Sequence, residues 1–596
     1  VVQSRDKMRQ RVEELFNYER YGIPSKKAGK YFYSHNDGLQ NQSILYVMDS
    51  LDGEGRMLLD PNTFSEDGTV SLKAYSVSED GRYLAYGLSD GGSDWTTFHV
   101  RDIETGKDLD DELKWSKFSG ASWTHDNVGF FYSRYDEPKD PLEQVNKGQK
   151  VYYHKVGTPQ ASDELIYERK DVPEMGFEAD VTEDGAWLTL TIWQGSEEKS
   201  RFYYRGIADT EMVRLLDDFD AAYHFLGNKG NLFWFVTDLE APRKRLIAID
   251  ITKPEREHWT EVIAETEETL QYTSLVGGKF ACNYLKDARA LVRIHELDGK
   301  VVREVDLPGI GDAGGFYGRS DDTETFYWFE TFTSPYAIHR YDMGTGESAL
   351  FKKSKVAFDP NDFEVEQVFY TSPDGTKVPM FIAHKKGITL DGTNPTILYG
   401  YGGFNIPLTP GFRVRNLAWM ELGGVFASAN TRGGGEYGRD WHEAGTLKRK
   451  QNVYDDFYAA AEYLVAEKYT SSEKLAINGG SNGGLLVGVA ILQRPELFAA
   501  AIPEVGVLDM LRYHEFTIGW AWASDYGTSD DPDLFPTLHG YSPYHNVESG
   551  KKYPATMIMT GDHDDRVVPA HSFKFAAALQ HGSADTSTVK NPALIR

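Results

Sequence analysis

The sequence has little cysteine, no long apolar run and few basic residues relative to acidic ones, and each of these shortages argues against a class of protein. Cys282 is the only cysteine, so no intrachain disulfide can form, and we expect a reducing, cytoplasmic location. No apolar run approaches the roughly 18 residues of a transmembrane helix, so we expect no membrane-spanning segment. Lysine and arginine total 63 against 91 acidic residues, and the formal charge of −28 argues against a nucleic-acid partner.

The 596-residue chain is too long for a single hydrophobic core, so two or more domains are expected. Residues 5–16 carry Met8, Val12 and Leu15 at helical spacing, which predicts an amphipathic helix. From residue 18 to about residue 356, short strands alternate with glycine turns, and Cys282 lies in one of these strands. Beyond residue 356, strands alternate with helices instead.

The strand-rich part repeats one unit of aromatic and β-branched strands between Gly or Asp turns. The first strands of these units are expected at residues 30–33, 82–86, 128–132, 186–190, 231–235, 279–282 and 324–328. This gives seven units at intervals of about 45 to 58 residues, enough for four short strands each. Radial repetition with this period is typical of a β-propeller, here with seven blades, while a pair of β-sandwiches is the alternative.

The C-terminal part follows the alternating pattern of a doubly wound α/β sheet. Residues 365–370 and 378–382 flank Ser-Pro-Asp-Gly, which predicts a β-hairpin. Further strands are expected at residues 396–399, 424–427, 475–477 and 555–560, with helices at residues 454–464, 485–492 and 572–580.

One strand–turn–helix carries a candidate nucleophile. The strand at residues 475–477 leads into residues 479–483, Gly-Gly-Ser-Asn-Gly, and the helix at residues 485–492 follows directly. This is the context of the G-x-S-x-G nucleophile elbow of α/β-hydrolases, with Ser481 at its apex. The turn strains the backbone and crowds its neighbours, so glycine is expected on both sides of the serine. The alternative is a glycine-rich loop with an idle serine.

A serine hydroxyl needs a base, and that base needs an orienting acid. In this fold the order is Ser, acid, His, each on a loop after a strand. The strand ending at Thr560 is followed by several carboxylates, and the spacing does not choose among Asp562, Asp564 and Asp565.

Four segments resemble the prolyl oligopeptidase family of serine peptidases, and the resemblance covers essentially the whole chain. They are residues 399–405 (Tyr-Gly-Tyr-Gly-Gly-Phe-Asn), 432–438 (Arg-Gly-Gly-Gly-Glu-Tyr-Gly), 479–484 (Gly-Gly-Ser-Asn-Gly-Gly) and 562–569 (Asp-His-Asp-Asp-Arg-Val-Val-Pro). The resemblance implies a seven-bladed β-propeller at residues 18–356 and an α/β-hydrolase domain at residues 357–596. Residues 1–17 would be a helical remnant of the N-terminal part of the hydrolase domain.

The resemblance also assigns site residues. The acid falls on Asp564, and the oxyanion hole falls on the Tyr401 hydroxyl and the backbone N–H of Asn482. Such donors stabilise the developing oxyanion by on the order of 3 kcal/mol each. The residues expected to bind substrate are an aromatic box for proline and an arginine for a substrate carbonyl: Phe404, Trp522, Tyr526 and Arg566.

The general base is missing from the sequence. His571 and His581 are the only histidines after Asp564, and both come too early for the family's order. His571 is expected to be structural. We therefore expect the catalytic histidine just beyond Arg596, with the hydrolase domain truncated before it.

These patterns predict a serine endopeptidase that cleaves short peptides after proline, with the propeller restricting access to the site. We expect a monomer without cofactor or metal. The alternatives are a peptide macrocyclase on the same scaffold, an oligopeptidase specific for basic residues, and an interaction scaffold with a dead hydrolase domain. The aromatic set argues against basic specificity, and the intact Ser481, Asp564 and Tyr401 argue against a dead domain.

Overall fold

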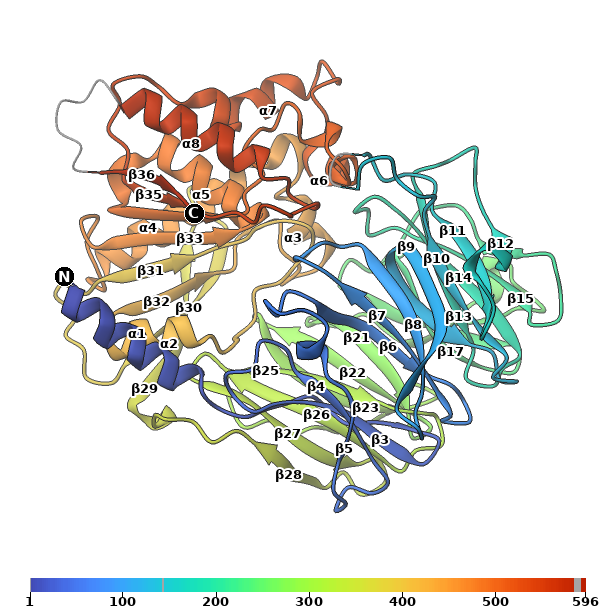
Figure 1. Ribbon diagram of the computed structural model, residues 1–596. Helices are drawn as coiled ribbons and strands as arrows, with labels where there is room; N and C mark the ends of the chain where they lie inside the picture. The colour runs from blue at the N-terminus through green and yellow to red at the C-terminus, as the bar shows by residue number, and fades with distance from the viewer. Residues whose placement is uncertain (1, 142–143, 584–590) are drawn as a thin grey trace.

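A mostly parallel sheet with helices on both faces forms the C-terminal half of the molecule, and radially arranged sheets form the N-terminal half (Figure 1). The structure is a computed structural model that describes residues 2–141, 144–583 and 591–596. Below, strands β1–β28 are called the propeller, and strands β29–β36 with their helices are called the hydrolase domain. This two-domain layout agrees with the prediction, although the exact boundaries remain predictions.

The hydrolase sheet has eight strands in the order β29-β30-β32-β31-β33-β34-β35-β36. They are β29 (Phe363–Thr371), β30 (Lys377–Lys385), β31 (Thr396–Tyr399), β32 (Val425–Ala429), β33 (Leu475–Gly480), β34 (Ala500–Glu504), β35 (Ala555–Ile558) and β36 (Ala593–Ile595). The first two form an antiparallel hairpin, and β32, β31, β33, β34, β35 and β36 pair in parallel. The loops after the parallel strands therefore meet at one edge of the sheet, where α/β folds build their sites.

Alternate residues of β30 enter two hydrophobic cores. Met380 and Ile382 pack with helices α4 and α5, whereas Phe381 and Ala383 pack with α1 and α2. Because successive side chains of a strand point to opposite faces, these helix pairs cover opposite faces of the sheet. The α-helices are α1 (Val2–Phe16), α2 (Val414–Glu421), α3 (Arg439–Glu443), α4 (Gln451–Ala466), α5 (Asn482–Gln493), α6 (Ala523–Tyr526), α7 (Phe535–Tyr541) and α8 (Ala570–Ser583).

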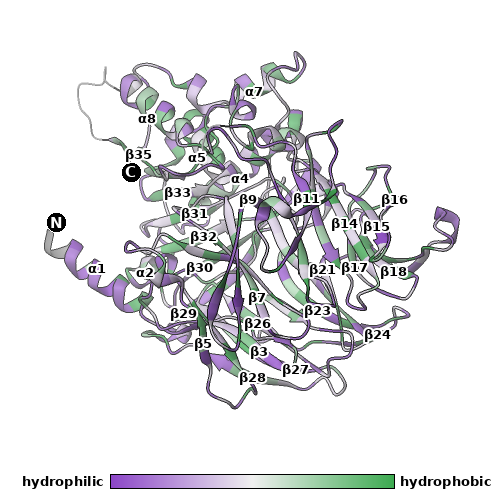
Figure 2. Ribbon diagram, turned by 45° about the vertical axis from the view of Figure 1, so that its right-hand side comes forward, coloured by the Kyte–Doolittle hydropathy of each residue, from purple (hydrophilic) through white to green (hydrophobic). Residues whose placement is uncertain are grey.

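Helix α1 precedes the propeller in sequence but packs on the hydrolase domain, beside α2 (Figure 1). Most of its residues are hydrophilic (Figure 2), whereas Leu15 is 1% exposed and lies in the core that includes Leu417. Arg11 donates from Nε and Nη2 to the Glu421 carboxylate, at 2.8 and 2.6 Å. Apolar packing at Leu15 and a bidentate ion pair from Arg11 thus join this helix to α2.

Strand β34 was not predicted from the sequence. It contains Pro503, which lacks an N–H for the sheet ladder and is unusual in a central strand. The Pro503 carbonyl nevertheless accepts the N–H of Met559 at 3.0 Å, and the strand pairs with β33 on its other side. Tertiary pairing here overrides a weak local preference.

Four sheets of the propeller have four strands and one has five, and each of these is a separate blade. The five-stranded sheet contains β1 (Arg20–Tyr21), β2 (Ser25–Lys27), β3 (Lys30–Asn36), β4 (Ile44–Met48) and β5 (Arg56–Leu59). The four-stranded sheets are β13 (Met175–Val181), β14 (Trp187–Gln194), β15 (Arg201–Gly206) and β16 (Val213–Leu216); β17 (Tyr223–Lys229), β18 (Leu232–Thr237), β19 (Arg245–Asp250) and β20 (Thr260–Ile263); β21 (Thr269–Val276), β22 (Lys279–Lys286), β23 (Arg289–Glu296) and β24 (Val301–Glu304); and β25 (Asp312–Tyr317), β26 (Glu324–Thr331), β27 (Ser334–Asp342) and β28 (Ser348–Lys353).

The predicted number of seven blades is wrong. The remaining strands form one continuous seven-stranded sheet, which leaves five separate blades. The cause is β9, whose 17 residues pair with β8 at one end and with β10 at the other. The strands of this sheet are β6 (Ser71–Val77), β7 (Tyr83–Ser89), β8 (Thr96–Asp102), β9 (Lys107–Trp123), β10 (Gly129–Arg134), β11 (Lys150–Lys155) and β12 (Glu164–Tyr167).

A buried histidine ties the seven-stranded sheet together. His154 of β11 is 0% exposed, and its two ring nitrogens lie 2.7 Å from carboxylate oxygens of Asp111 and Asp163. Burial alone would lower the pKa of His154, but the hydrogen bonds to both carboxylates outweigh it and raise the pKa to about 9. The imidazolium is thus the stable form in the folded protein at neutral pH.

This cluster predicts a pH-dependent stability. The pKa of His154 is raised to about 9 in the folded protein, so its contribution is complete below the unfolded value, near 6.5, and is lost as pH rises through about 9. Thermal midpoints measured between pH 6 and pH 9 should fall for the parent protein and much less for His154→Gln.

The matched control for this experiment is His295→Gln. His295 is also buried in a propeller strand, but burial lowers its pKa, so it should contribute no loss above pH 6.5. Equal pH dependence of the parent and His154→Gln proteins would refute the assignment of the charge to His154.

Candidate functional site

Ser481 occupies a sharp turn between β33 and α5. Its backbone has φ 56° and ψ −117°, a conformation that costs a non-glycine residue about 1–3 kcal/mol. The turn is held by the Ser481 N–H, which donates to the Glu504 carbonyl of β34 at 2.8 Å. The strained serine and its strand–helix setting are the features that define a nucleophile elbow.

Glycines around Ser481 let three backbone segments approach closely. A Cβ on Gly479 would lie 2.4 Å from the Gly483 carbonyl oxygen, and one on Gly483 would lie 2.6 Å from that of Gly400. Gly480 differs from the prediction, because its nearest neighbour would lie at 3.9 Å, an ordinary contact. Close packing therefore requires glycine at positions 479 and 483 but not at position 480.

The Tyr401 side chain lies close enough to Ser481 for the two to interact, and its role in an oxyanion hole remains a prediction. Burial raises the pKa of Tyr401 to about 12, and a hydrogen bond with Ser481 offsets part of that rise. Tyr401 thus stays a neutral hydrogen-bond donor throughout the physiological pH range. The Asn482 N–H belongs to the first turn of α5, where backbone donors lack partners within the helix.

The Asn482 side chain connects the predicted oxyanion and proline sites, a link that the sequence did not indicate. It is 1% exposed, donates from Nδ2 to the Tyr401 carbonyl at 2.5 Å and accepts the Tyr526 hydroxyl at 2.8 Å. One buried amide therefore fixes the loop of Tyr401 relative to Tyr526.

The three predicted box residues gather beside this amide. The rings of Phe404 and Tyr526 meet edge to face, with centroids 5.4 Å apart. Trp522 stacks on Tyr513 at 6.1 Å, and Tyr513 in turn meets Tyr526 at 5.3 Å. Tyr526 is 1% exposed, whereas Phe404 and Trp522 are only partly buried and retain surface for a ligand.

The three candidate acids in the loop after β35 have different surroundings. Asp562 is exposed and bonds to His563, and Asp565 is 1% exposed and paired with the propeller residue Lys117. Asp564 accepts the N–H groups of Val567 and Arg566 at 2.9 and 3.0 Å. Burial raises its pKa, and those two N–H groups oppose the rise.

Asp564 and Asp562 line a cavity of about 540 Å³ with Phe516, Thr517 and Phe573. Asp564 is therefore the half-buried carboxylate of this loop that has free space beside it. His571 is 1% exposed and accepts the N–H of Asp509, and burial lowers its pKa to about 4. These contacts give it a structural place, and among the described residues no histidine side chain hydrogen-bonds to Ser481.

Arg566, predicted to bind a substrate carbonyl, is held by the propeller. Its Nε and Nη2 donate to the two carboxylate oxygens of Asp94, both at 2.8 Å. Asp94 contributes its own N–H to Asp565 at 2.9 Å. The fork geometry orients the guanidinium, and its Nη1 atom is not used by this pair.

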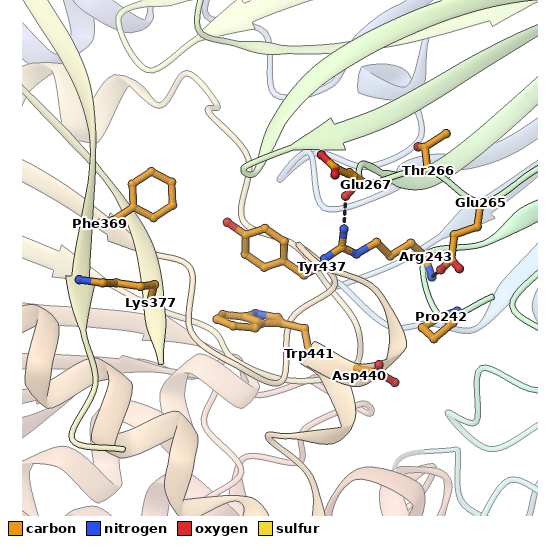
Figure 3. Close-up of a pocket in the computed structure, with 10 residues that line it drawn as sticks. All are labelled: Pro242, Arg243, Glu265, Thr266, Glu267, Phe369, Lys377, Tyr437, Asp440 and Trp441. Carbon is orange, nitrogen blue, oxygen red and sulfur yellow. Dashed lines mark hydrogen bonds between the residues drawn. The ribbon is translucent and has the colours of Figure 1, made fainter. Parts of the chain in front are cut away.

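A second cavity, of about 900 Å³, opens between the propeller and the hydrolase domain (Figure 3). Arg243 and Glu267 face it from the propeller, and Tyr437 and Trp441 face it from the hydrolase domain. Its described lining includes none of the predicted site residues. This cavity is therefore separate from the predicted site at Ser481.

A buried ion pair joins the propeller to the loop of Asp564. Lys117 Nζ lies 2.6 Å from Asp565 Oδ2, and the two side chains are 0% and 1% exposed. Lys117 also donates to Asn146 Oδ1 at 2.9 Å and lies over the Trp95 ring, 4.5 Å from its centroid. Sequence reasoning missed this pair, because its partners are 448 residues apart.

Removing one partner of this pair should favour opening of the two domains. Lys117→Met leaves the Asp565 carboxylate buried without its cation, at a cost of about 3–5 kcal/mol that separation of the domains would relieve. We expect a larger radius of gyration in small-angle X-ray scattering than for the parent protein. Lys150→Met, which removes an ion pair with Asp136 inside the propeller, should not change it. An unchanged radius for Lys117→Met would contradict a closing role.

Comparisons with known proteins show which family this chain belongs to. Residues 1–354 match the family described as "Prolyl oligopeptidase, N-terminal beta-propeller domain", and residues 410–593 match the "Prolyl oligopeptidase family". The chain is 47% identical to a prolyl endopeptidase of Elizabethkingia meningoseptica over 99% of this chain and 83% of that protein. A solved prolyl endopeptidase structure, from work on inter-domain dynamics, aligns with TM-score 0.95 and 42% identity, over 99% and 87% of the two chains.

Prolyl oligopeptidase B of Galerina marginata is similar in two solved states. Bound to a 25mer macrocyclization substrate, it aligns with TM-score 0.93 and 34% identity over 99% of this chain and 86% of that one. Its apo structure aligns with TM-score 0.75 over 99% and 87%. The domain arrangement here is thus closer to the peptide-bound relative. With both halves matched in order around the elbow of Ser481, the chain belongs to the prolyl oligopeptidase family of serine peptidases.

Proposed function

We propose that this chain hydrolyses short peptides on the C-terminal side of proline, with Ser481 as nucleophile. The observation that carries the proposal is the contact of Asn482 with both the Tyr401 loop and Tyr526. This contact supports a single site that would combine the serine next to Asn482, the Tyr401 loop and the aromatic residues beside Tyr526. The similarity to prolyl endopeptidases supports the same substrate class.

In the proposed mechanism the Ser481 hydroxyl oxygen attacks the carbonyl carbon of the proline residue itself, and the bond from that carbon to the nitrogen of the next residue then breaks. The Tyr401 hydroxyl and the Asn482 N–H would donate to the oxyanion that forms; Tyr401 interacts with Ser481, and the Asn482 N–H belongs to the first turn of α5, beside the serine. The rise in the pKa of Tyr401 to about 12 favours this role, since the group must keep its proton to donate it.

Asp564 is proposed to orient the histidine that is predicted beyond Arg596. Strands β35 and β36 run in parallel, and the Thr560 N–H donates to the Arg596 carbonyl at 3.0 Å. A residue soon after Arg596 would therefore emerge beside the loop of Asp564. The bonds of Asp565 to Lys117 leave Asp564 as the acid with the better access to such a residue.

Proline would lie against Phe404 and Trp522, with Tyr526 as the buried wall of the pocket. A pyrrolidine ring stacks well on a flat aromatic surface, whereas a basic side chain would need a carboxylate there. The remaining donor of Arg566 would bind a substrate carbonyl. We propose that the substrates are short because the propeller is joined to the hydrolase domain at Asp94 and Lys117, close to the site.

Other expectations remain predictions from the sequence: a monomer in the cytoplasm that needs no cofactor and binds neither nucleic acid nor membrane. Among the described residues, no helix has the length and apolarity to cross a membrane. The macrocyclase alternative rests on relatives such as the Galerina marginata enzyme, at 36% identity, which is lower than for the prolyl endopeptidases.

Initial rates on blocked fluorogenic dipeptides test the proposed function. With the protein extended to its natural termini, we expect cleavage of a substrate that ends in proline and little cleavage of one that ends in arginine. Ser481→Ala should reduce the proline rate by at least about 10³-fold, because the nucleophile is lost.

Two outcomes would contradict the proposal. Absence of serine-dependent cleavage of either substrate in a folded protein would favour an interaction scaffold. Faster serine-dependent cleavage after arginine would keep the peptidase but reject the proline pocket.

A further inference from the structure

The loop that carries both Tyr401 and Phe404 has an unusual backbone. Gly402, Phe404 and Asn405 have φ values of 67°, 57° and 54°, in the left-handed region. For the two residues other than glycine this costs about 1–3 kcal/mol each. Such a backbone persists only if surrounding groups hold it in place.

Asp525 supplies one such group. It is 0% exposed, and its Oδ2 accepts the N–H of Phe404 at 3.1 Å. It lies in α6 between Trp522 and Tyr526, so the segment that forms one wall of the proposed proline pocket also holds the backbone of the other wall.

Lys450 supplies the second group. It is 1% exposed, and its Nζ donates to the Gly402 carbonyl at 3.0 Å. The same Nζ lies 3.6 Å from Asp525 Oδ2 and 5.1 Å from the centroid of the Tyr526 ring. The ammonium and the carboxylate therefore compensate each other's burial while holding the loop at two positions, 402 and 404.

His442 of α3 completes the set. Its Nε2 lies 2.7 Å from Asp525 Oδ1, the oxygen that Phe404 does not use. Burial raises the pKa of Asp525, and the hydrogen bond from His442 and the charge of Lys450 lower it below its ordinary value. Asp525 is thus a carboxylate with each oxygen engaged.

We propose that Asp525, together with Lys450, is a positioning residue of this site: the pair fixes residues 402–404 so that the Tyr401 hydroxyl meets the oxyanion and the Phe404 ring meets proline. The inference deepens the proposed function and rests on it. Neither charged group needs to touch the substrate, since each acts through the backbone of the loop.

This role differs measurably from one in folding alone. A loss of folded protein lowers the apparent kcat for every substrate equally and leaves KM unchanged. A displaced Phe404 instead weakens the preference for proline over alanine, because the smaller side chain makes little use of the aromatic wall. A misplacement of about 1 Å in such a site costs on the order of 100-fold in rate.

The test uses the protein with its natural termini and two blocked dipeptide substrates, one ending in proline and one in alanine. For Asp525→Asn we expect kcat/KM for proline to fall about 10- to 100-fold. The loss for alanine should be smaller, so the proline-to-alanine ratio should drop by at least about 5-fold, with a higher KM for proline.

Asp509→Asn is the matched control. Asp509 is also 0% exposed and lies beside a lysine and a histidine, Lys574 and His545, but it contacts α8 rather than the 402–404 loop. Its replacement should lower the thermal midpoint and leave the proline-to-alanine ratio unchanged. If Asp525→Asn does not fold, Lys450→Met, which removes the bond to Gly402, must lower the ratio instead.

The outcomes separate the two proposals. A parent protein that cleaves neither substrate overturns the proposed function. A parent protein that prefers proline, with Asp525→Asn and Lys450→Met folded and unchanged in their ratio, overturns the positioning role alone.

Discussion

A buried charge must be paired, and this constraint shapes the surroundings of Ser481. Asp565 belongs to the loop after β35 and is paired with Lys117 of the propeller, while Asp525 lies beside the loop after β31 and is paired with Lys450. Each pair fixes a loop at the carboxyl edge of the parallel sheet. The first joins two domains, and the second holds a strained backbone, so the arrangement of the edge depends on both.

The elbow could be predicted from the sequence because its requirements are local. A strand, a serine between small residues and a helix occupy adjacent positions, and the steric limits at Gly479 and Gly483 involve backbone atoms that close approach brings together. The alternation of strands and helices likewise predicted the sheet, because the spacing of apolar residues within each segment indicates whether that segment is a buried strand or an amphipathic helix. The roles of Tyr401, Phe404 and Arg566 came instead from resemblance to a family, and no local pattern would have assigned them.

Features that depend on distant partners were not predictable. Lys117 and Asp565 are separated by 448 residues, and nothing in either neighbourhood indicates the other. The predicted number of blades was wrong for a related reason. The repeat in the sequence indicates where each unit begins, but it does not show that strand β9 runs from one unit into the next and joins them in a single sheet. Strand β34 was missed because Pro503 weakens its local signal, while pairing with β33 and β35 stabilises it.

The central claim is that Ser481, Tyr401, Asn482 and the aromatic pocket act on one substrate. A crystal structure of the protein with its natural termini, bound to a blocked peptide aldehyde ending in prolinal, tests it most directly. The account predicts a covalent bond from Ser481 Oγ to the aldehyde carbon, the resulting oxygen within hydrogen-bond distance of the Tyr401 hydroxyl and the Asn482 N–H, and the pyrrolidine ring against Phe404 and Trp522. An adduct on another residue, or a ring bound outside this pocket, would contradict it.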